Sequence, residues 1–509
     1  MVGWTRGVAH AGTNCWRRPS SLPFQSRPVT AGTAHVADLG TEDLTDCFWP
    51  IASGDKIRRV DYQRCVDILT KAHENPSGLP REVRQENVSR LLQALGRPEQ
   101  GLRGMLVVGT NGKGSTCAFA VSAVAASGAR VGSMPSPHLQ EPRERIRIDG
   151  VPVTRDQYAA AFAEVWGAIE RHGLPVLAQG IFATTAAVHF RRASVDLAVA
   201  EASIGGSRAA AAELGLDVKV VTGIGLDHTR LLGNSLTDIT QAKVACVQDG
   251  DHVVLGRLAP EAAASAQRVL RERTKLSVWR MDHEIHYTAR PAGRDGNSGP
   301  VTLVDVTTPR AVHRALPCSL RGPHQPHTLA LALASVDAMA ERGHSREPDG
   351  ERLRSRLAAT HWPGRLELLP RARLGDWTGR VLLEGATNPQ GVATTAPEIL
   401  RHAGADGPSE PPVLVFAAMD DKDVTGMLAP LPSDWPLVLT RTGSHQAASP
   451  TTLHSQLMPG RRGPCLTAED TPTALHRATE LAGPGGLIVV LGSLRLVGES
   501  RTALGLQPA

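Results

Sequence analysis

The sequence is poor in lysine. Its basic residues number 55, and all but seven of them are arginine. The lysines stand at positions 56, 71, 113, 219, 243, 275 and 422. The formal net charge is +5, but the basic residues do not gather into a stripe, so we expect no nucleic-acid partner. Because arginine is the default cation of this chain, the few lysines are the first candidates for chemistry.

Paired cysteines and long apolar runs are also lacking. Seven cysteines are scattered along the chain, odd in number and never in CxxC spacing. This distribution argues against a disulfide framework or a zinc site and favours a reducing, cytoplasmic compartment. No apolar run reaches membrane-spanning length, so no membrane association is expected.

Acidic residues are missing from positions 1–37, which carry Arg6, Arg17, Arg18 and Arg27. That composition resembles a transit peptide. The stretch shows no clear amphipathic period, however, so a disordered extension is the preferred interpretation. We predict that residues 1–56 are poorly structured.

Length and periodicity predict two α/β domains. A chain of 509 residues is too long for one ordinary core. Apolar strand-like runs alternate with helical patterns, which favours a mostly parallel sheet with helices on both faces. A second, smaller series of the same kind begins after Pro363. We therefore predict a first domain at 57–360 and a second, Rossmann-like domain at 361–509.

One glycine-rich turn dominates the first domain. The apolar run from Met105 leads into GTNGKGST at 109–116, and a small-residue helix is predicted to follow. Strand, loop and helix in this order form a phosphate cradle, with Lys113 reaching the β- and γ-phosphates. The spacing from Gly109 to Lys113 is shorter than in the usual P-loop, so a plain glycine turn is the alternative.

Polar groups follow three predicted strands. Ser136, Glu201 and His228 each come soon after an apolar run. Each has an ordinary explanation by itself, as a solvated loop residue, a strand-end carboxylate or a structural histidine. Ligands of α/β sheets bind at the carboxyl ends of strands, and oxygen donors with one imidazole suit Mg²⁺ beside nucleotide phosphates. Together with the phosphate loop they predict a magnesium–nucleotide site.

Many separate motifs, in order, resemble one family. They are GTNGKGST at Gly109, SPHL and RERIRIDG between Ser136 and Gly150, AVAEASIGG at Ala198, IGLDHTRLLG at Ile224, AK at Ala242, GPHQ at Gly322, WPGRLE at Trp362, EGATNP at Glu384, FAAMDDKD at Phe416 and GSLRLVGE at Gly492. The chain resembles the Mur ligase superfamily, and within it folylpolyglutamate synthase and dihydrofolate synthase. The similarity runs from about residue 57 to about residue 505.

The resemblance implies an ATP-dependent amide ligase that works through an acyl phosphate. It also implies a P-loop α/β domain followed by a Rossmann-like domain, with the site closing between them. The implied catalytic residues are Lys113, His228, Lys243 and Arg365. The implied metal ligands are Ser115, Ser136, Glu201 and His228. The implied ATP-binding residues are Gly109, Thr110, Asn111, Gly112, Lys113, Gly114, Ser115, Thr116, His324, Gln325, Arg365 and Glu384.

Lys243 matches a lysine that is carbamylated in this family, which would make it an anion beside Mg²⁺. The substrate-handling segments depart from the family pattern. The family's DGAHNP has Glu384 and Thr387 here, and Ser207 to Ala212 has lost most of its usual polar groups. The residues that match the family's ATP-binding groups are intact, so we expect an active ATP-dependent enzyme with altered substrates.

Several functions stay open. Addition of glutamate to a folate or pteroate is slightly preferred over a paralogue that joins another acid and amino acid in a specialised pathway. A nucleotide-binding regulatory module would explain the loop but not Lys243 or Arg365. A GTPase would need a guanine-specificity motif such as NKxD, which is not found. The expected partners are small-molecule acids and amino acids, and we expect a monomer.

Overall fold

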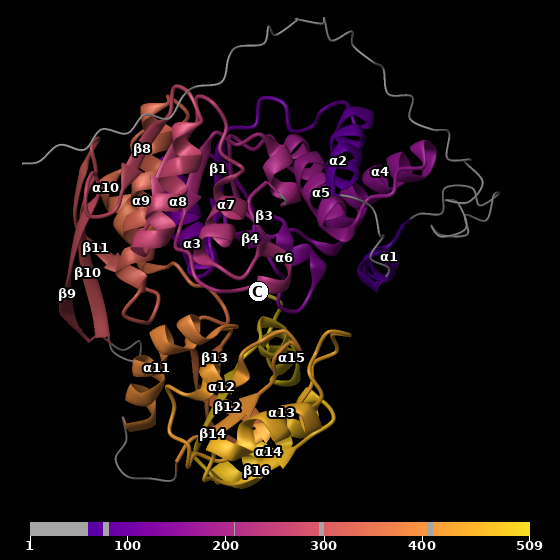
Figure 1. Ribbon diagram of the computed structural model, residues 1–509, viewed down its shortest axis with the longest axis vertical. Helices are drawn as coiled ribbons and strands as arrows, with labels where there is room; N and C mark the ends of the chain where they lie inside the picture. The colour runs from indigo at the N-terminus through magenta and orange to yellow at the C-terminus, as the bar shows by residue number, and fades with distance from the viewer. Residues whose placement is uncertain (1–59, 75–80, 208, 295–299, 405–410) are drawn as a thin grey trace, which may run out of the picture. The chain divides into compact units, whose positions relative to one another are not determined.

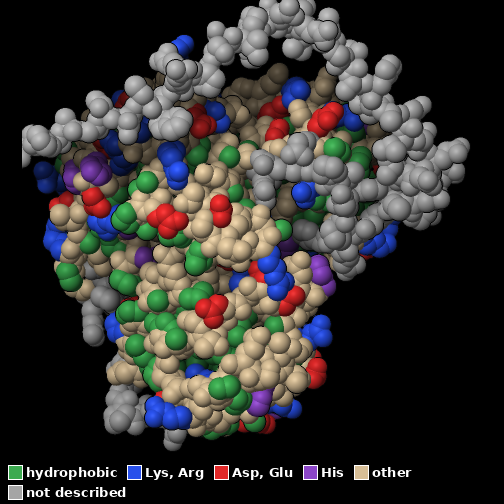
Figure 2. All heavy atoms as spheres, in the orientation of Figure 1, with side chains coloured by type: hydrophobic (Ala, Val, Ile, Leu, Met, Phe, Trp, Pro, Cys, Tyr) green, Lys and Arg blue, Asp and Glu red, His purple; other side chains and the backbone are tan. Residues whose placement is uncertain are grey.

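The computed structural model describes residues 60–74, 81–207, 209–294, 300–404 and 411–509 (Figure 1). The predicted N-terminal extension at 1–56 therefore lies outside the described residues. Among the described helices, none is both long and apolar enough to cross a membrane. Figure 2 shows acidic and basic side chains interspersed on the visible face.

The first sheet has eight strands in the order β4-β3-β2-β5-β1-β6-β7-β8. The strands are β1 Gly104–Val108, β2 Val131–Met134, β3 Arg147–Ile148, β4 Val151–Pro152, β5 Leu197–Glu201, β6 Val218–Val221, β7 His252–Leu255 and β8 Ser277–Arg280. β2 and β5 to β8 run parallel with β1, and the short β3 pairs antiparallel with both β2 and β4. Every residue of β1 and β5 is buried, as expected for parallel strands covered on both faces.

Helices cover both faces of this sheet. They are α1 Tyr62–Glu74, α2 Arg81–Ala94, α3 Lys113–Ala126, α4 Arg155–His172, α5 Ala178–Arg192, α6 Thr229–Leu232, α7 Leu236–Val244, α8 Pro260–Arg271, α9 Gln325–Glu341 and α10 Gly350–Ala358. Leu106 and Val108 of β1 pack into one core with α4 and α5. Met105 and Val107 pack into another core with α3 and α9. The alternation follows from the two-residue period of a strand.

An antiparallel sheet in the order β11-β10-β9 packs against α9. Its strands are β9 His286–Arg294, β10 Pro300–Thr307 and β11 Val312–Cys318. The glycine-containing stretch at 293–300 includes the end of β9 and the start of β10, and its residues 295–299 lie outside the described residues. Val304 and Val306 of β10 are fully buried, and they join the α9 core.

The second α/β series forms a six-stranded sheet in the order β12-β13-β17-β14-β15-β16. Its strands are β12 Glu367–Leu374, β13 Trp377–Glu384, β14 Val413–Phe416, β15 Leu437–Leu439, β16 Cys465–Thr467 and β17 Leu487–Leu491. Its helices are α11 Pro389–Gly404, α12 Val424–Leu428, α13 Pro450–Leu457, α14 Thr471–Ala482 and α15 Leu494–Ala503. Short 3₁₀ helices lie at Pro142–Arg145, Ala210–Leu214 and Met458–Gly460.

The predicted fold class is confirmed. A mostly parallel sheet with helices on both faces is followed in sequence by a smaller, mostly parallel sheet. The strands of the second sheet all follow residue 360. The division into domains at that position stays a prediction.

Candidate active site

The phosphate loop joins β1 to α3. Gly109 has φ 145° and Gly112 has φ 84°, a region that L side chains rarely adopt. A Cβ at Gly109 would also lie 2.1 Å from Thr222 Oγ1. No acidic residue stands in the first turn of α3. The N-terminus of α3 therefore lies at the site without an acidic residue in its own first turn.

Lys113 folds back over this loop. Its Nζ donates to Gly109 O at 3.2 Å and to Thr110 O at 3.1 Å. Two residues later, Ser115 Oγ accepts from Gln325 Nε2 at 3.4 Å. The buried Oγ1 of Thr116 has no hydrogen-bond partner within the described part of the chain. A cation and hydroxyls thus lie together on the phosphate loop and the first turn of α3.

Glu201 ends β5 next to Ser136. Its Oε2 accepts from Ser136 N at 3.1 Å, and Arg145 Nη1 donates to Ser136 Oγ at 3.1 Å. Glu201 is buried, and burial raises its pKa while Lys113 opposes the rise. A buried carboxylate and a hydroxyl therefore lie together beside the phosphate loop.

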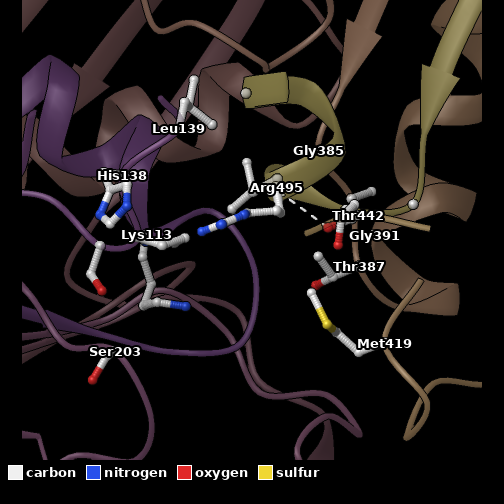
Figure 3. A pocket seen from close by; sticks show the side chains of 18 of the residues that line it. Lys113, His138, Leu139, Ser203, Gly385, Thr387, Gly391, Met419, Thr442 and Arg495 are labelled. Atoms are coloured by element: carbon white, nitrogen blue, oxygen red, sulfur yellow. Dashed lines mark hydrogen bonds between the residues drawn. The ribbon is translucent and has the colours of Figure 1, made fainter. Parts of the chain in front are cut away.

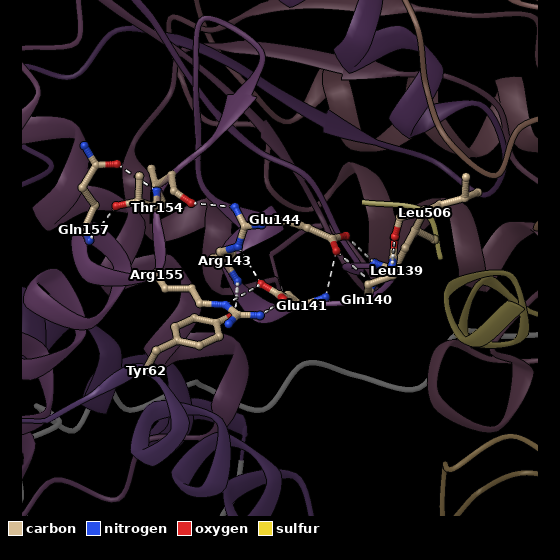
Figure 4. A network of polar contacts seen from close by, with 11 residues as sticks. Tyr62, Leu139, Gln140, Glu141, Arg143, Glu144, Thr154, Arg155, Gln157 and Leu506 are labelled. Carbon is tan, nitrogen blue, oxygen red and sulfur yellow. Dashed lines mark hydrogen bonds and ion pairs between the residues drawn. The ribbon is translucent and has the colours of Figure 1, made fainter. Parts of the chain in front are cut away.

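The loop that carries Ser136 is fixed by a polar network (Figure 4). The Glu144 carboxylate accepts from the backbone N–H groups of Leu139 at 2.8 Å, Gln140 at 3.0 Å and Glu141 at 2.8 Å. Glu141 in turn binds Arg143 at 2.6 Å and pairs with Arg155. Satisfied networks of this kind hold a backbone in one conformation, which positions Ser136.

His228 follows β6 and begins α6 in the left-handed conformation, with φ 51°. Burial lowers its pKa, and the neighbouring Asp227 opposes that change. Asp227 accepts from Lys422 Nζ at 2.6 Å and from Asn388 Nδ2 at 3.2 Å, both on the second series. The imidazole is therefore neutral at physiological pH and can donate a lone pair.

Lys243 contacts the phosphate loop rather than the cavity. The side chain is buried in α7, and its Nζ donates to Gly109 O at 2.7 Å. Burial, with a smaller effect of the Lys113 charge, lowers the pKa of Lys243 to about 7. A substantial fraction of this amine is therefore unprotonated near neutral pH.

The second series contributes Arg365 and Glu384. Arg365 Nη1 lies 3.8 Å from Glu384 Oε1, and Glu384 Oε2 accepts from Leu366 N at 2.9 Å. Glu384 is buried at the end of β13, and burial raises its pKa against the influence of Arg365. The carboxylate thus orients the arginine.

A polar cluster begins α9. Gln325 Nε2 lies 3.0 Å from His324 Nε2, and Thr328 Oγ1 donates to Gln325 Oε1 at 2.8 Å. Burial, followed by the Arg365 charge, lowers the pKa of His324 to about 4, so this ring is neutral. Gln325 itself is fully buried.

These groups surround one cavity of about 1660 Å³ with walls from both series (Figure 3). Most of the predicted residues line it. They are Thr110, Asn111, Gly112, Lys113, Gly114, Ser115, Ser136, Glu201, His228, His324, Arg365 and Glu384. Gly109, Thr116, Lys243 and Gln325 are not among the lining residues. They support the wall from behind.

The chain is similar to known ligases along most of its length. A dihydrofolate synthase/folylpolyglutamate synthase of Mycobacterium tuberculosis is 31% identical over 83% of this chain and 90% of the relative. A folylpolyglutamate synthase of Lacticaseibacillus casei is 30% identical over 81% of this chain and 92% of the relative. No protein-family model matches the chain. The chain belongs to the folylpolyglutamate synthase/dihydrofolate synthase family.

Solved structures of this family have the same fold. A Mycobacterium tuberculosis folylpolyglutamate synthase complexed with ADP matches with a TM-score of 0.74 and 27% identity, over 88% of this chain and 99% of that chain. A folylpolyglutamate synthase complexed with AMPPCP and folate matches with a TM-score of 0.71 and 26% identity, over 87% of this chain and 99% of that chain. The predicted Mur ligase fold and the class of ATP-dependent ligase are therefore confirmed.

The sequence motifs did not predict a role for every residue that lies at the site in this structure. Arg145, Asn388 and Lys422 lie inside motifs that were recognised, yet no role followed from the sequence. Arg145 is buried, with its guanidinium carbon 4.1 Å from the Phe182 ring centre. Arg495 lines the cavity from the GSLRLVGE segment. The available signal was a basic residue inside a recognised motif, aspartate-rich around Lys422 and containing glycine and serine around Arg495.

Proposed function

We propose that this family member joins the carboxylate of a folate or pteroate to the amine of an amino acid, with ATP cleaved to ADP. The observation that carries the proposal is the cavity, whose wall combines the phosphate loop, Glu201 and His228 with Arg365 and Glu384. The relatives named above support the substrate class. The substrate carboxylate attacks the γ-phosphate, the amine then attacks the acyl carbon, and phosphate leaves.

Charge on the transferring phosphoryl group is neutralised from two sides. Lys113 and the loop N–H groups act from the first series, and Arg365 acts from the second. Preorganised donors of this kind act most strongly where little water remains. The buried Glu384 attracts Arg365 across 3.8 Å, which favours an orientation of the guanidinium towards this end of β13.

Mg²⁺ would be held by Ser136, Glu201 and His228, with Ser115 nearby on the phosphate loop. One carboxylate, hydroxyls and a neutral imidazole form a suitable donor set, and magnesium keeps several waters and phosphate oxygens as further ligands. Among the described residues, no group of three or more His, Cys, Asp or Glu side chains is placed to hold a metal. That fits a site completed by the nucleotide. A bound magnesium ion would neutralise phosphate charge and orient the γ-phosphate.

Lys243 would act as a carbamate. Its buried, partly neutral amine is suited to take up CO₂, and the anion formed would balance the charge of Lys113. Intact-mass measurement under bicarbonate, with Lys243→Ala as the control, tests this step. Equal masses after correction for the substitution would contradict it.

The acceptor side supports a second candidate, in which another amine replaces glutamate. Thr387 lines the cavity where the family pattern has histidine, and a threonine hydroxyl cannot become cationic. The same wall carries other basic residues, so we keep glutamate as the first acceptor to test.

The deciding experiment is ADP release by the purified full chain with ATP and Mg²⁺. Dihydropteroate, tetrahydrofolate and related acids are combined with L-glutamate and other amino acids, and products are identified by mass spectrometry. We expect ADP only when both an acid and an amine are present. If the rate of ADP release is independent of the acid and the amine, the protein is instead a nucleotide-binding module.

A further inference from the structure

The cavity walls differ in chemical character from one series to the other. Near α1 and α5 the lining is mainly apolar, and it includes Val66, Leu69, Leu177, Phe182 and Ile204. Around α15 and the segment after β15 the lining is polar and charged. It includes Arg441, His445, Glu469, Asp470, Arg495 and Glu499. An aromatic acid fits the apolar wall, and a zwitterionic amino acid fits the charged wall.

Arg495 stands out on the charged wall. Figure 3 shows its side chain extending from α15 into the space between Lys113 and His138 on one side and Thr387, Thr442 and Met419 on the other. The side chain is 49% exposed in a residue that lines the cavity. Its guanidinium is thus accessible from within the site.

An ion pair at one edge of the Arg495 guanidinium orients this group. Arg495 Nε lies 3.4 Å from Glu499 Oε1, one helical turn along α15. Glu499 is itself held by Gly443 N at 2.9 Å and by Thr471 Oγ1 at 2.5 Å. No other side-chain hydrogen bond or ion pair joins Arg495 to a residue that the structure describes. The two Nη groups therefore remain for a ligand.

Three other cations near the site are already engaged, whereas Arg441 on the same wall has no side-chain partner among the described residues. Lys422 pairs with Asp227 at 2.6 Å and with Asp421 at 3.4 Å. Arg365 is paired with Glu384, and Lys113 is bound to the phosphate loop. Thr387 supplies no charge. A carboxylate entering along this wall therefore meets two available guanidinium groups, and of these Arg495 is the one held by an ion pair within α15 and seen to extend into the cavity in Figure 3.

We propose that Arg495 binds a carboxylate of the acceptor amino acid and thereby sets acceptor specificity. The proposal rests on the ligase function above. In L-glutamate the bound group is either the α-carboxylate or the side-chain carboxylate, and both offer the same bidentate chemistry. The contact orients the acceptor so that its amine faces the acyl phosphate near Arg365.

The test compares Arg495→Gln and Arg495→Lys with the wild type in the ADP-release assay. The amine is L-glutamate, L-glutamine or isoglutamine, so each carboxylate is removed in turn. Arg495→Gln should raise the KM for glutamate roughly 10- to 100-fold, as expected for a lost charge-assisted pair, with the KM for ATP unchanged. The KM of Arg495→Lys for glutamate should lie between the values of the wild type and Arg495→Gln. Arg371→Gln, at an exposed position of β12, is the matched control.

The amide that lacks the bound carboxylate should be insensitive to the substitution, with nearly equal KM in wild type and Arg495→Gln. An unchanged glutamate KM in Arg495→Gln, or a change confined to the ATP KM or to kcat, would overturn the proposal. So would a larger effect of Arg441→Gln on the same wall. A wild type inactive with every acid and amine would instead refute the ligase function itself.

Discussion

Lys113 donates to the carbonyl groups of its own loop, which places its ammonium at the proposed phosphate site. Lys113→Ala removes that charge without disturbing the buried face of α3. We expect kcat to fall by on the order of 10²- to 10³-fold, as for the loss of one preorganised donor. Steady-state ADP release measures the effect. Near-normal ligation by Lys113→Ala would contradict a catalytic role for the phosphate loop.

His252 makes stability depend on pH. It is buried at the start of β7, 4.4 Å from the Trp279 ring, and burial, aided by Arg342, lowers its pKa to about 4. The unfolded histidine titrates near its ordinary pKa of about 6.5, so the unfolded chain binds more protons between the two values. This contribution to stability is complete above pH 6.5 and is lost as the pH falls towards 4.

His252→Asn should remove that dependence. Urea unfolding at several pH values between 7 and 4 would show the wild type losing on the order of 1–3 kcal/mol more than the variant. Parallel curves for the two proteins would show that His252 titrates normally in the folded chain.

At the scale of single residues, the sequence identified groups but not their orientation. The motifs brought Lys113, Glu201 and His228 to one cavity, because strand ends of a parallel sheet share an edge. Lys243 Nζ contacts Gly109 O behind the loop, and its expected role beside the metal stays a prediction. Side-chain direction depends on the packing of α7, which spacing does not reveal.

At the scale of elements, a buried ion pair attaches α15 to β12. Arg501 Nη1 pairs with Glu367 Oε1, and both side chains are only 7% exposed. Arg501 also donates to Gln140 Oε1 at 3.0 Å and to Gln507 O at 2.9 Å. Since α15 carries Arg495, this pair also maintains the charged wall of the cavity.

Arg501→Met should destabilise the protein by about 3–5 kcal/mol, because it leaves the Glu367 carboxylate buried without its partner. Arg501→Met combined with Glu367→Gln should recover part of the loss, since no charge is then stranded. Urea unfolding of the two variants and the wild type measures both effects. Equal stability of the single and double variants would contradict the assigned pair.

Elements with a strong apolar signal were predicted well. The continuous apolar runs at 252–255 and 487–491 are typical of buried strands, and they form β7 and β17, which are fully buried. β2 has the sequence VGSM and was not delimited, because glycine and serine weaken the strand signal. α2 is mostly polar, and its sequence gives little helical signal, because helical periodicity needs apolar residues to mark it.

At the scale of the whole molecule, residues far apart in sequence meet at the site. Asn388 Nδ2 donates to Asn111 Oδ1 at 3.0 Å, and Asn111 Nδ2 donates back to Asn388 Oδ1 at 3.2 Å, across 277 positions. No local pattern predicts such a pair. Order and spacing of motifs indicated that both series contribute to one site, but not which side chains connect the phosphate loop to α11.

The last prediction concerns the contact between Asn388 and Asn111. Asn388 Oδ1 also accepts from Gly391 N at 2.8 Å in the first turn of α11, so Asn388→Ala removes a helix cap as well as the contact to Asn111. Asn388→Ser keeps a capping hydroxyl but is too short to reach Asn111, and it separates the two effects. We expect both variants to lower kcat by roughly 10-fold, as for the loss of one or two neutral hydrogen bonds.

The affinity for ATP should change little, because the loop N–H groups and Lys113 remain. Stability should fall in Asn388→Ala and be largely retained in Asn388→Ser. Equilibrium binding of an ATP analogue, urea unfolding and ADP release measure the three quantities. If Asn388→Ser ligates as fast as the wild type, the contact between the phosphate loop and α11 serves folding alone, and Arg365 reaches the phosphate without it.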